Sequence, residues 1–160
     1  MRRNRKIQNA QAVGIYKSRL EKKMADCLEE RGIVADYEKH TFVLVEKFRF
    51  ENKSYKGKQG HILLAESAAI RRMTYTPDFV SIEYNFIVEC KGFPNDAFPL
   101  KWKLFKKYLV ENNLDYDLYI PRNKLQCEVV ADQILFNIQN PKQDVRGTKS
   151  RTSKRSKTRR

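Results

Sequence analysis

The sequence has none of the long apolar runs, paired cysteines or apolar leader that mark membrane and secreted proteins. An apolar run such as 86–88 is far shorter than the ~20 residues of a membrane-spanning helix. The basic N-terminus is not followed by an apolar segment, which argues against a secretory signal. The three cysteines, Cys27, Cys90 and Cys127, are widely separated and form no C-x-x-C pair, so neither a disulfide framework nor a zinc site is indicated. We therefore expect a soluble protein of a reducing cytoplasm.

Acidic residues are also scarce, and the resulting positive charge is concentrated at the two ends of the chain. The 160 residues contain 33 Lys/Arg and 19 Asp/Glu, which gives a net charge of +14. Residues 142–160 hold nine Lys/Arg and one Asp, and residues 1–6 hold four Lys/Arg. Residues 7–141 therefore carry a net charge of only +2.

Both charged ends lack the apolar residues that packing requires. We expect a basic N-terminal arm at 1–12 and a disordered basic C-terminal tail at 141–160. Nucleic-acid binding is the favoured role, because cationic side chains displace counterions from phosphate. Solvated ends that only aid solubility are the alternative. The tail residues assigned to DNA are Arg151, Lys154 and Arg155.

Between these ends, residues 13–140 are long enough for a single domain with an apolar core. Apolar residues at helical spacing predict an amphipathic helix over 18–31 that stops at Gly32. The other elements expected are two strands in 34–50, an exposed loop at 51–60, two strands in 75–91 joined near 83–85, a helix that begins after Pro99, a short strand at 115–120 and a final helix at 131–139, with 62–72 unassigned. This order indicates α/β or α+β packing around a central sheet.

The stretch "IVECKG" places an acid and a lysine inside an apolar run. Side chains alternate faces along a strand, so Ile87, Glu89 and Lys91 would share one face and Cys90 would lie on the other. Charges on a mostly buried strand are tolerated when they pair with each other or with a metal ion. An ion pair at the end of the strand is the structural alternative to a catalytic pair.

A second acid, Asp78 in "YTPDF", follows a proline at the entry of the neighbouring strand. If the two strands pair antiparallel, Asp78 and Glu89 meet at the same end of the sheet. Two close carboxylates repel, and a divalent cation between them removes the repulsion. Because both are hard oxygen ligands with no paired His or Cys nearby, Mg²⁺ or Mn²⁺ is favoured over zinc. The alternative for Asp78 is an ordinary turn or cap residue.

A third acid, Glu21, borders the buried stripe of the first predicted helix. It is the acid of that helix placed toward the edge of the core. Ser18 and Glu21 also have the S-x-x-E spacing of a capping box, in which the glutamate reaches back to the cap amide. From the spacing alone, a helix-capping role is favoured for Glu21.

Three stretches, taken in order, resemble the PD-(D/E)XK nuclease superfamily. They are residues 13–38, T-P-D-F in "YTPDF" (75–79) and E-x-K in "FIVECKG" (86–92). More specifically, they resemble the phage endonuclease I family of Holliday-junction resolvases, and the similarity extends through 101–110 and the "DYDLYI" stretch. The resemblance implies an α/β fold with a restriction-endonuclease-like core, in which helices flank a central mixed β-sheet.

The resemblance also implies a catalytic set, Glu21, Asp78, Glu89 and Lys91. The three acids would form the metal cluster together with the backbone carbonyl of Cys90, and the lysine would lie beside the attacking water. Asp36 falls where the family has a further acid, and Glu38 is close enough in sequence to compete for that role. The implied cofactor is Mg²⁺, with Mn²⁺ as a substitute.

The activity implied is that of a metal-dependent, structure-selective endodeoxyribonuclease that hydrolyses branched DNA and resolves Holliday junctions. The implied assembly is a homodimer without membrane association, in the host cytoplasm if the chain is phage-encoded. One alternative is a nuclease of the same superfamily that serves nicking, restriction or transposon-end cleavage. Another is a non-catalytic DNA-binding module.

The chain departs from the family pattern by an insertion at about 46–72. In the resolvases the corresponding connection helps to entwine two subunits, so the insertion puts an intertwined dimer in question. A DNA-contacting hairpin and a solvated loop are both open for it, and the cations that favour the hairpin include Lys53, Lys56, Lys58, Arg71 and Arg72. On the helix after Pro99, three lysines can follow a phosphate backbone or simply form a charged surface: Lys103, Lys106 and Lys107.

Overall fold

The computed structural model of the chain describes residues 14–58, 61–65, 69–93 and 96–141. The helices are α1 (Arg19–Glu29), α2 (Phe98–Glu111) and α3 (Lys124–Gln139). The strands are β1 (Asp36–Tyr37), β2 (Phe42–Val45), β3 (Phe48–Arg49), β4 (Ser54–Lys58), β5 (His61–Ala65), β6 (Ala69–Ile70), β7 (Met73–Tyr75), β8 (Phe79–Ser81), β9 (Phe86–Val88) and β10 (Asp117–Tyr119). The predicted N-terminal arm, and the predicted tail from 142 onward with Arg151, Lys154 and Arg155, lie outside the described residues.

A four-stranded mixed sheet in the order β1-β8-β9-β10 forms the centre of the molecule. Strand β8 pairs antiparallel with both β1 and β9, whereas β10 runs parallel to β9. A turn connects β8 to β9, and Asn85 in this turn adopts the left-handed region with φ 51°. The prediction of two antiparallel strands in 75–91 is therefore confirmed, as is an α/β fold around a mixed sheet.

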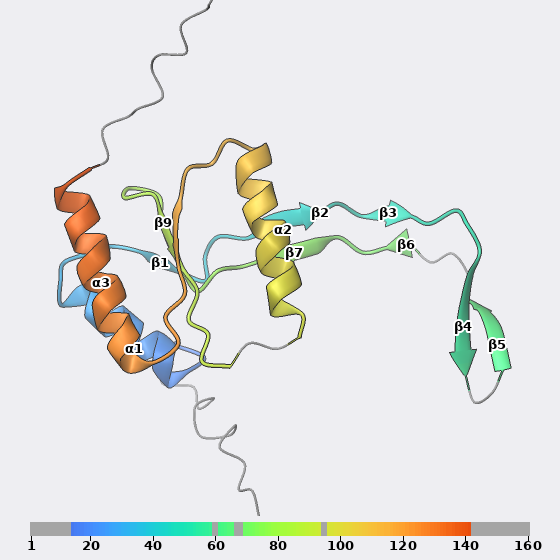
Figure 1. Cartoon of the computed structure of the whole chain (residues 1–160), viewed down its shortest axis with the longest axis horizontal. Helices are drawn as coiled ribbons and strands as arrows, with labels where there is room; N and C mark the ends of the chain where they lie inside the picture. The colour runs from blue at the N-terminus through green and yellow to red at the C-terminus, as the bar shows by residue number, and fades with distance from the viewer. Residues whose placement is uncertain (1–13, 59–60, 66–68, 94–95, 142–160) are drawn as a thin grey trace, which may run out of the picture.

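Helices cover both faces of this sheet (Figure 1). On one face, α1 and α3 pack over the strands, and the buried residues there include Met24, Phe86, Val88, Cys127 and Ile134. On the other face, α2 packs over the sheet, and the buried residues there include Val80, Ile87, Trp102, Phe105 and Leu109. Strands buried on both faces are expected to read as continuous apolar runs, as "FIV" does in β9.

The helix boundaries follow local capping chemistry. Ser18 is extended and its side chain accepts a hydrogen bond from the Glu21 amide, so α1 begins at the predicted place. Gly32 follows the helix with φ 65°, a conformation that glycine adopts without steric cost. The last helix begins at Lys124 rather than 131, because Asn123 caps it by accepting from the Gln126 amide. Among the described residues, no helix has the length and apolar content needed to cross a membrane.

A long β-ribbon, formed by the strand pairs β2–β7, β3–β6 and β4–β5, extends away from the central sheet (Figure 1). The predicted exposed loop at 51–60 is wrong in its described part, because β4 occupies 54–58 and pairs with β5 in a regular antiparallel register. Likewise, 34–50 contains three short strands rather than two. Sequence composition suggested a loop because both faces of this part of the ribbon carry exposed residues, Tyr55 and Ile62 on one face and Ser54 and His61 on the other.

Candidate active site

Two acids from neighbouring strands lie opposite each other at one end of the sheet. The β8–β9 register pairs Phe79 with Val88, so the next position pairs Asp78 with Glu89. Side chains at directly opposed positions share a face of the sheet. The Cys90 amide donates to Asp78 Oδ2 over 2.6 Å, which fixes the position of that carboxylate. The structure thus brings together the two acids that the sequence placed at the same end of the sheet.

This position is electrostatically unfavourable for two negative charges. Burial is the main cause that raises the pKa of Asp78 to about 8, and the charges of Glu89 and, more weakly, Glu21 act in the same direction. Burial also raises the pKa of Glu89, opposed by the Tyr75 hydroxyl and by Lys91. The cause in both cases is a carboxylate that loses hydration without a full counter-charge.

The Glu89 carboxylate is held from two sides. The Tyr75 hydroxyl donates to Oε2 over 2.8 Å, and Lys91 Nζ lies 3.4 Å from Oε1. Lys91 also lies over the ring of Phe98 at 4.9 Å, so its ammonium group is on the α2 side of the sheet. The Cys90 side chain packs in the opposite core, against α1 and α3. The predicted alternation of faces is therefore confirmed, and the lysine and glutamate do form an ion pair.

Glu21 serves as a capping residue and also faces the protein interior. Its side chain is 7% exposed, and its Oε1 accepts from the Ser18 hydroxyl over 2.7 Å. Its Oε2 accepts from the Lys17 amide over 2.9 Å and from the Tyr37 hydroxyl over 2.6 Å. Because its charge contributes to the raised pKa of Asp78, Glu21 lies within electrostatic range of the acidic pair. The serine half of the predicted capping box is present, whereas the Glu21 carboxylate accepts from the Lys17 amide in place of the cap amide.

Of the two candidates for a further acid, Glu38 is the one beside the pair. Its amide donates to the Asp78 carbonyl over 2.9 Å, which continues the β1–β8 ladder. Its φ of 46° is a left-handed conformation that is unusual for a residue other than glycine. Asp36 instead pairs with His40 at 2.7 Å and Lys39 at 3.0 Å, and these hydrogen bonds lower its pKa. The structure therefore engages Asp36 away from the site and places Glu38 at its edge.

Lys17 connects this edge to the acids. Its ammonium group forms an ion pair with Glu38. The hydrogen bond to Glu38 raises the pKa of Lys17, and the charges of Glu21 and Asp78 add to the shift. No periodic signal in the sequence marks this residue, because it precedes the first helix.

A cavity of about 210 Å³ opens beside Glu89. Glu89 and Lys91 line it from β9, and Lys101 and Phe98 line it from α2. Lys101 was not singled out from the sequence, although it lies three residues after Phe98 and so shares its side of the helix. A larger cavity of about 540 Å³ lies at the opposite end of β9, near Phe86, and is lined by none of the four predicted catalytic residues.

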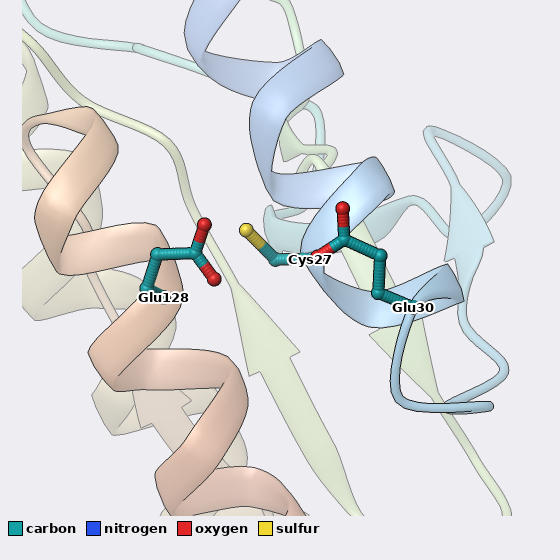
Figure 2. Close-up of side chains that lie close together, drawn as sticks. All are labelled: Cys27, Glu30 and Glu128. Carbon is teal, nitrogen blue, oxygen red and sulfur yellow. The ribbon is translucent and has the colours of Figure 1, made fainter.

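Another group of potential metal ligands lies between α1 and α3 (Figure 2). Among the described residues, Cys27, Glu30 and Glu128 have ligating atoms within 4.8 Å of one another, whereas Glu21, Asp78 and Glu89 do not close to that separation. Glu128 already pairs with two cations, Lys23 and Arg31. Burial raises the pKa of the Cys27 thiol, which keeps it protonated. This group is an ion-pair network between helices rather than a metal centre.

The predicted DNA-binding residues that the structure describes are exposed on two surfaces. Lys103, Lys106 and Lys107 lie on the solvent side of α2, where Lys106 covers the Trp102 ring at 5.7 Å and Lys107 pairs with Glu111 at 3.4 Å. Arg71 and Arg72 lie on the ribbon, where they line a hollow of about 510 Å³ with Lys47. The two surfaces flank the α2 face of the sheet.

Comparison of the chain with protein-family models, curated proteins and solved structures finds no match. The resemblance carried by the three motifs therefore stays a prediction. The described fold is an α/β fold with a mixed sheet, and no fold family is assigned to it.

Proposed function

We propose that this protein is a metal-dependent endodeoxyribonuclease of the PD-(D/E)XK type, with a restriction-endonuclease-like core, that cleaves branched DNA. The observation that supports it best is the opposition of Asp78 and Glu89, with Lys91 beside them and an open cavity on the same side. A fold that needed only an ion pair at this place would not require a second acid, the half-buried Asp78, beside Glu89. Two acids and one lysine at adjoining strand ends are the residue types that metal-assisted phosphodiester hydrolysis uses.

The residues at this place fit a divalent cation. Burial raises the pKa values of both Asp78 and Glu89, so their ionised forms are disfavoured in the protein alone, and a bound cation would stabilise them. The two carboxylates and the Cys90 carbonyl would hold Mg²⁺ or Mn²⁺, with Glu21 helping to position its water shell. When bound, the cation lowers the pKa of a coordinated water and neutralises charge on the phosphodiester.

The remaining site residues orient groups and balance charge. Tyr75 fixes Glu89 through its hydroxyl, so one carboxylate oxygen keeps a constant direction. Lys91 is placed to orient the nucleophilic water or to stabilise negative charge that develops on the phosphate. Lys101 adds a second positive charge to the wall of the cavity, where a phosphate group would lie. Neither lysine is fully buried, so both can contact a polymer that approaches from solvent.

A Holliday junction is the proposed substrate and a homodimer the proposed assembly, since both follow from the resemblance to the endonuclease I family. Two dimer-related sites would let symmetric strands of a four-way junction be cut together. The competing proposal is a DNA-binding module. It is favoured by the direct ion pair between Lys91 and Glu89, which could stabilise the end of the strand without any chemistry.

The decisive experiment compares cleavage of a synthetic four-way junction and of linear duplex with the same sequence. We expect wild-type protein to cut the junction faster, with Mg²⁺ or Mn²⁺ but not with a chelator. Glu89→Gln and Lys91→Ala should each lower the cleavage rate by roughly 10²-fold or more, because they remove a metal ligand or a charge that acts in the transition state. Binding of the junction should stay within a few-fold of wild type.

Lys22→Ala is the matched control, since Lys22 is also a partly exposed lysine paired with an acid, Asp26 on α1. It should leave the rate unchanged. Equal rates on junction and duplex would reject the junction selectivity but keep the nuclease. Binding of DNA without cleavage under any divalent cation would instead support the binding module.

A further inference from the structure

The β-ribbon, defined above by its three strand pairs, is fixed at its base to the candidate active site. Tyr75, in β7, donates to Glu89 and packs on Phe105 of α2 at 4.6 Å between ring centroids. Phe42, in β2, packs on Phe105 at 5.1 Å and on Tyr108 at 5.8 Å. Strand β7 then leads within three residues to Asp78. The base of the ribbon and the acidic pair therefore move as one unit.

Beyond this base, the ribbon leaves the core (Figure 1). Phe48 is 50% exposed in β3, and Ile70 is 40% exposed in β6. Farther along, Tyr55 in β4 is 63% exposed and Ile62 in β5 is 77% exposed. A two-stranded ribbon that buries so little has marginal stability alone. An extended element of this kind is expected to rest on a partner.

The ribbon has a net positive charge, whereas the rest of the chain between the two basic ends does not. Residues 46–72 contain seven Lys/Arg and three Asp/Glu, a net charge of +4. Residues 7–45 and 73–141 together carry a net charge of −2. The positive excess outside the two ends of the chain thus lies in the ribbon. A second copy of this chain would bring two such positive ribbons together, whereas DNA supplies the opposite charge.

The ribbon also has a local site suited to phosphate. Lys47, Arg71 and Arg72 line the 510 Å³ hollow, together with one acid, Glu46. All four residues are exposed. Toward the tip, the sequence of β4 adds two further lysines, Lys56 and Lys58. A row of cations on a narrow two-stranded element matches the backbone of a duplex, whose major groove admits such a ribbon.

We propose that the β-ribbon is a second DNA-binding surface, which grips the duplex flanking the cut site through Lys47, Arg71 and Arg72 and continues toward its tip. This inference rests on the proposed function for the place of the cut site. Residues 46–58 span at most about 40 Å when extended, slightly more than one helical turn of DNA. Contacts near the tip therefore need a duplex longer than one turn, whereas contacts at the hollow do not.

The test measures binding of full-length protein to junctions whose arms are about one or about three helical turns long, in the presence of a chelator. In one variant, an Asn-Gly turn replaces 46–72 and joins Val45 to Met73, which are paired in β2–β7. We expect it to lose roughly tenfold or more in affinity for long arms and distinctly less for short arms. Equal losses, or none, would overturn the proposal.

A second variant tests the hollow without removing the ribbon. Arg71→Gln with Arg72→Gln should weaken binding to both junctions by several-fold and flatten the salt dependence by up to about 2 in slope, since two phosphates are no longer neutralised. The matched control, Lys22→Gln with Lys39→Gln, removes the same charge outside the hollow and should change affinity less than twofold. If the two double variants weaken binding equally, the ribbon contributes only to the net charge of the protein, and the proposal fails.

Two further outcomes are distinguishable. If the ribbon-less protein sediments as a monomer while wild type is a dimer, and DNA affinity per site is unchanged, the ribbon is a contact between copies and the proposal is wrong. If wild type binds with the expected dependence on arm length but cuts nothing with Mg²⁺ or Mn²⁺, the ribbon inference holds and the proposed nuclease fails. Circular dichroism and Tm of each variant establish that it is folded.

Discussion

At the residue scale, the opposition of Asp78 and Glu89 is unfavourable for the protein alone. Both carboxylates lose hydration, and the one lysine beside them cannot neutralise two charges. A fold selected for stability alone would use a neutral residue at one of the two positions. Groups placed against their own electrostatics are typical of functional sites, where a ligand supplies the missing charge.

Asp78→Asn tests this trade between stability and activity. The amide oxygen can still accept from the Cys90 amide, so the local hydrogen bond is kept. In a chelator, we expect the variant to be more stable than wild type by roughly 1–2 kcal/mol, about 3–6 °C in Tm, because the cost of desolvating the Asp78 charge and its repulsion by Glu89 are both removed. Adding Mg²⁺ should raise the Tm of wild type but not that of the variant, and cleavage should be lost.

Thermal unfolding with and without Mg²⁺ measures both effects. Asp36→Asn is the control, since Asp36 is engaged by His40 and Lys39 and its removal should not stabilise the protein. A variant at Asp78 that is less stable than wild type in a chelator would mean that the carboxylate is structural.

At the element scale, α1 and α3 are joined by an ion-pair network that packing alone would not predict. Glu128 of α3 pairs with Lys23 and Arg31, and Arg31 also reaches Asp132 at 2.8 Å. The hydrogen bond from Lys23 is the main cause that lowers the pKa of Glu128 to about 2. The network lies on the rim of the buried contact between the two helices, around Cys27 and Cys127.

Glu128→Gln should therefore destabilise the protein in a pH-dependent way. The pKa of Glu128 is lower in the folded state than its ordinary value of 4.5, so the carboxylate stabilises the fold above about pH 4.5. That contribution is lost as the pH falls from 4.5 toward 2. The urea concentration at the midpoint of unfolding should differ between wild type and variant at pH 7, and the two values should converge near pH 2. Glu111→Gln is the control, because Glu111 forms an exposed ion pair with Lys107. If the stability difference between wild type and Glu128→Gln persisted at low pH, the ion pairs of Glu128 would not be its cause.

The elements also differ in how far the sequence could predict them. Helix α1 was predicted because its buried residues repeat with a helical period, and the β8–β9 pair because two short apolar runs are separated by turn residues. Helix α3 was predicted too short, since its first turns expose Leu125 and Val129 and so break the apolar pattern. The outer part of the ribbon, β4, was missed as strand because its described residues are exposed and do not pack on the core, and without a buried face there is no alternation to read.

The candidate site, like the fold, could be predicted only where a local sequence pattern marks its residues. Strand alternation was enough to place Glu89 and Lys91 on one face, and the antiparallel pairing then brought Asp78 to them. The hydroxyl of Tyr75 and the position of Glu38 depend on strand register across the sheet, which a single sequence does not encode locally. Long-range register, rather than residue type, limited the prediction.

At the scale of the whole molecule, charge is divided among three regions that differ in sign or size. Residues 7–45 and 73–141 together carry −2, residues 46–72 of the ribbon +4, and the two ends, 1–6 and 142–160, +12 together. An acidic cluster within a protein that binds DNA needs positive charge elsewhere to overcome repulsion from phosphate. The ribbon and the ends would supply that charge without placing it among the acids of the candidate site.

Removing 142–160 should separate binding from chemistry. The segment holds nine Lys/Arg and one Asp, so its removal should weaken junction binding and flatten the slope of log affinity against log salt, by about 0.9 for each phosphate that the segment neutralises. Cleavage of a short junction at saturating protein should keep its wild-type rate, because Asp78, Glu89 and Lys91 are untouched. Replacing the segment with a Gly/Ser chain of equal length is the control for length alone. Loss of metal-dependent cleavage at saturation, with the fold intact by circular dichroism, would instead mean that the C-terminal segment takes part in the reaction.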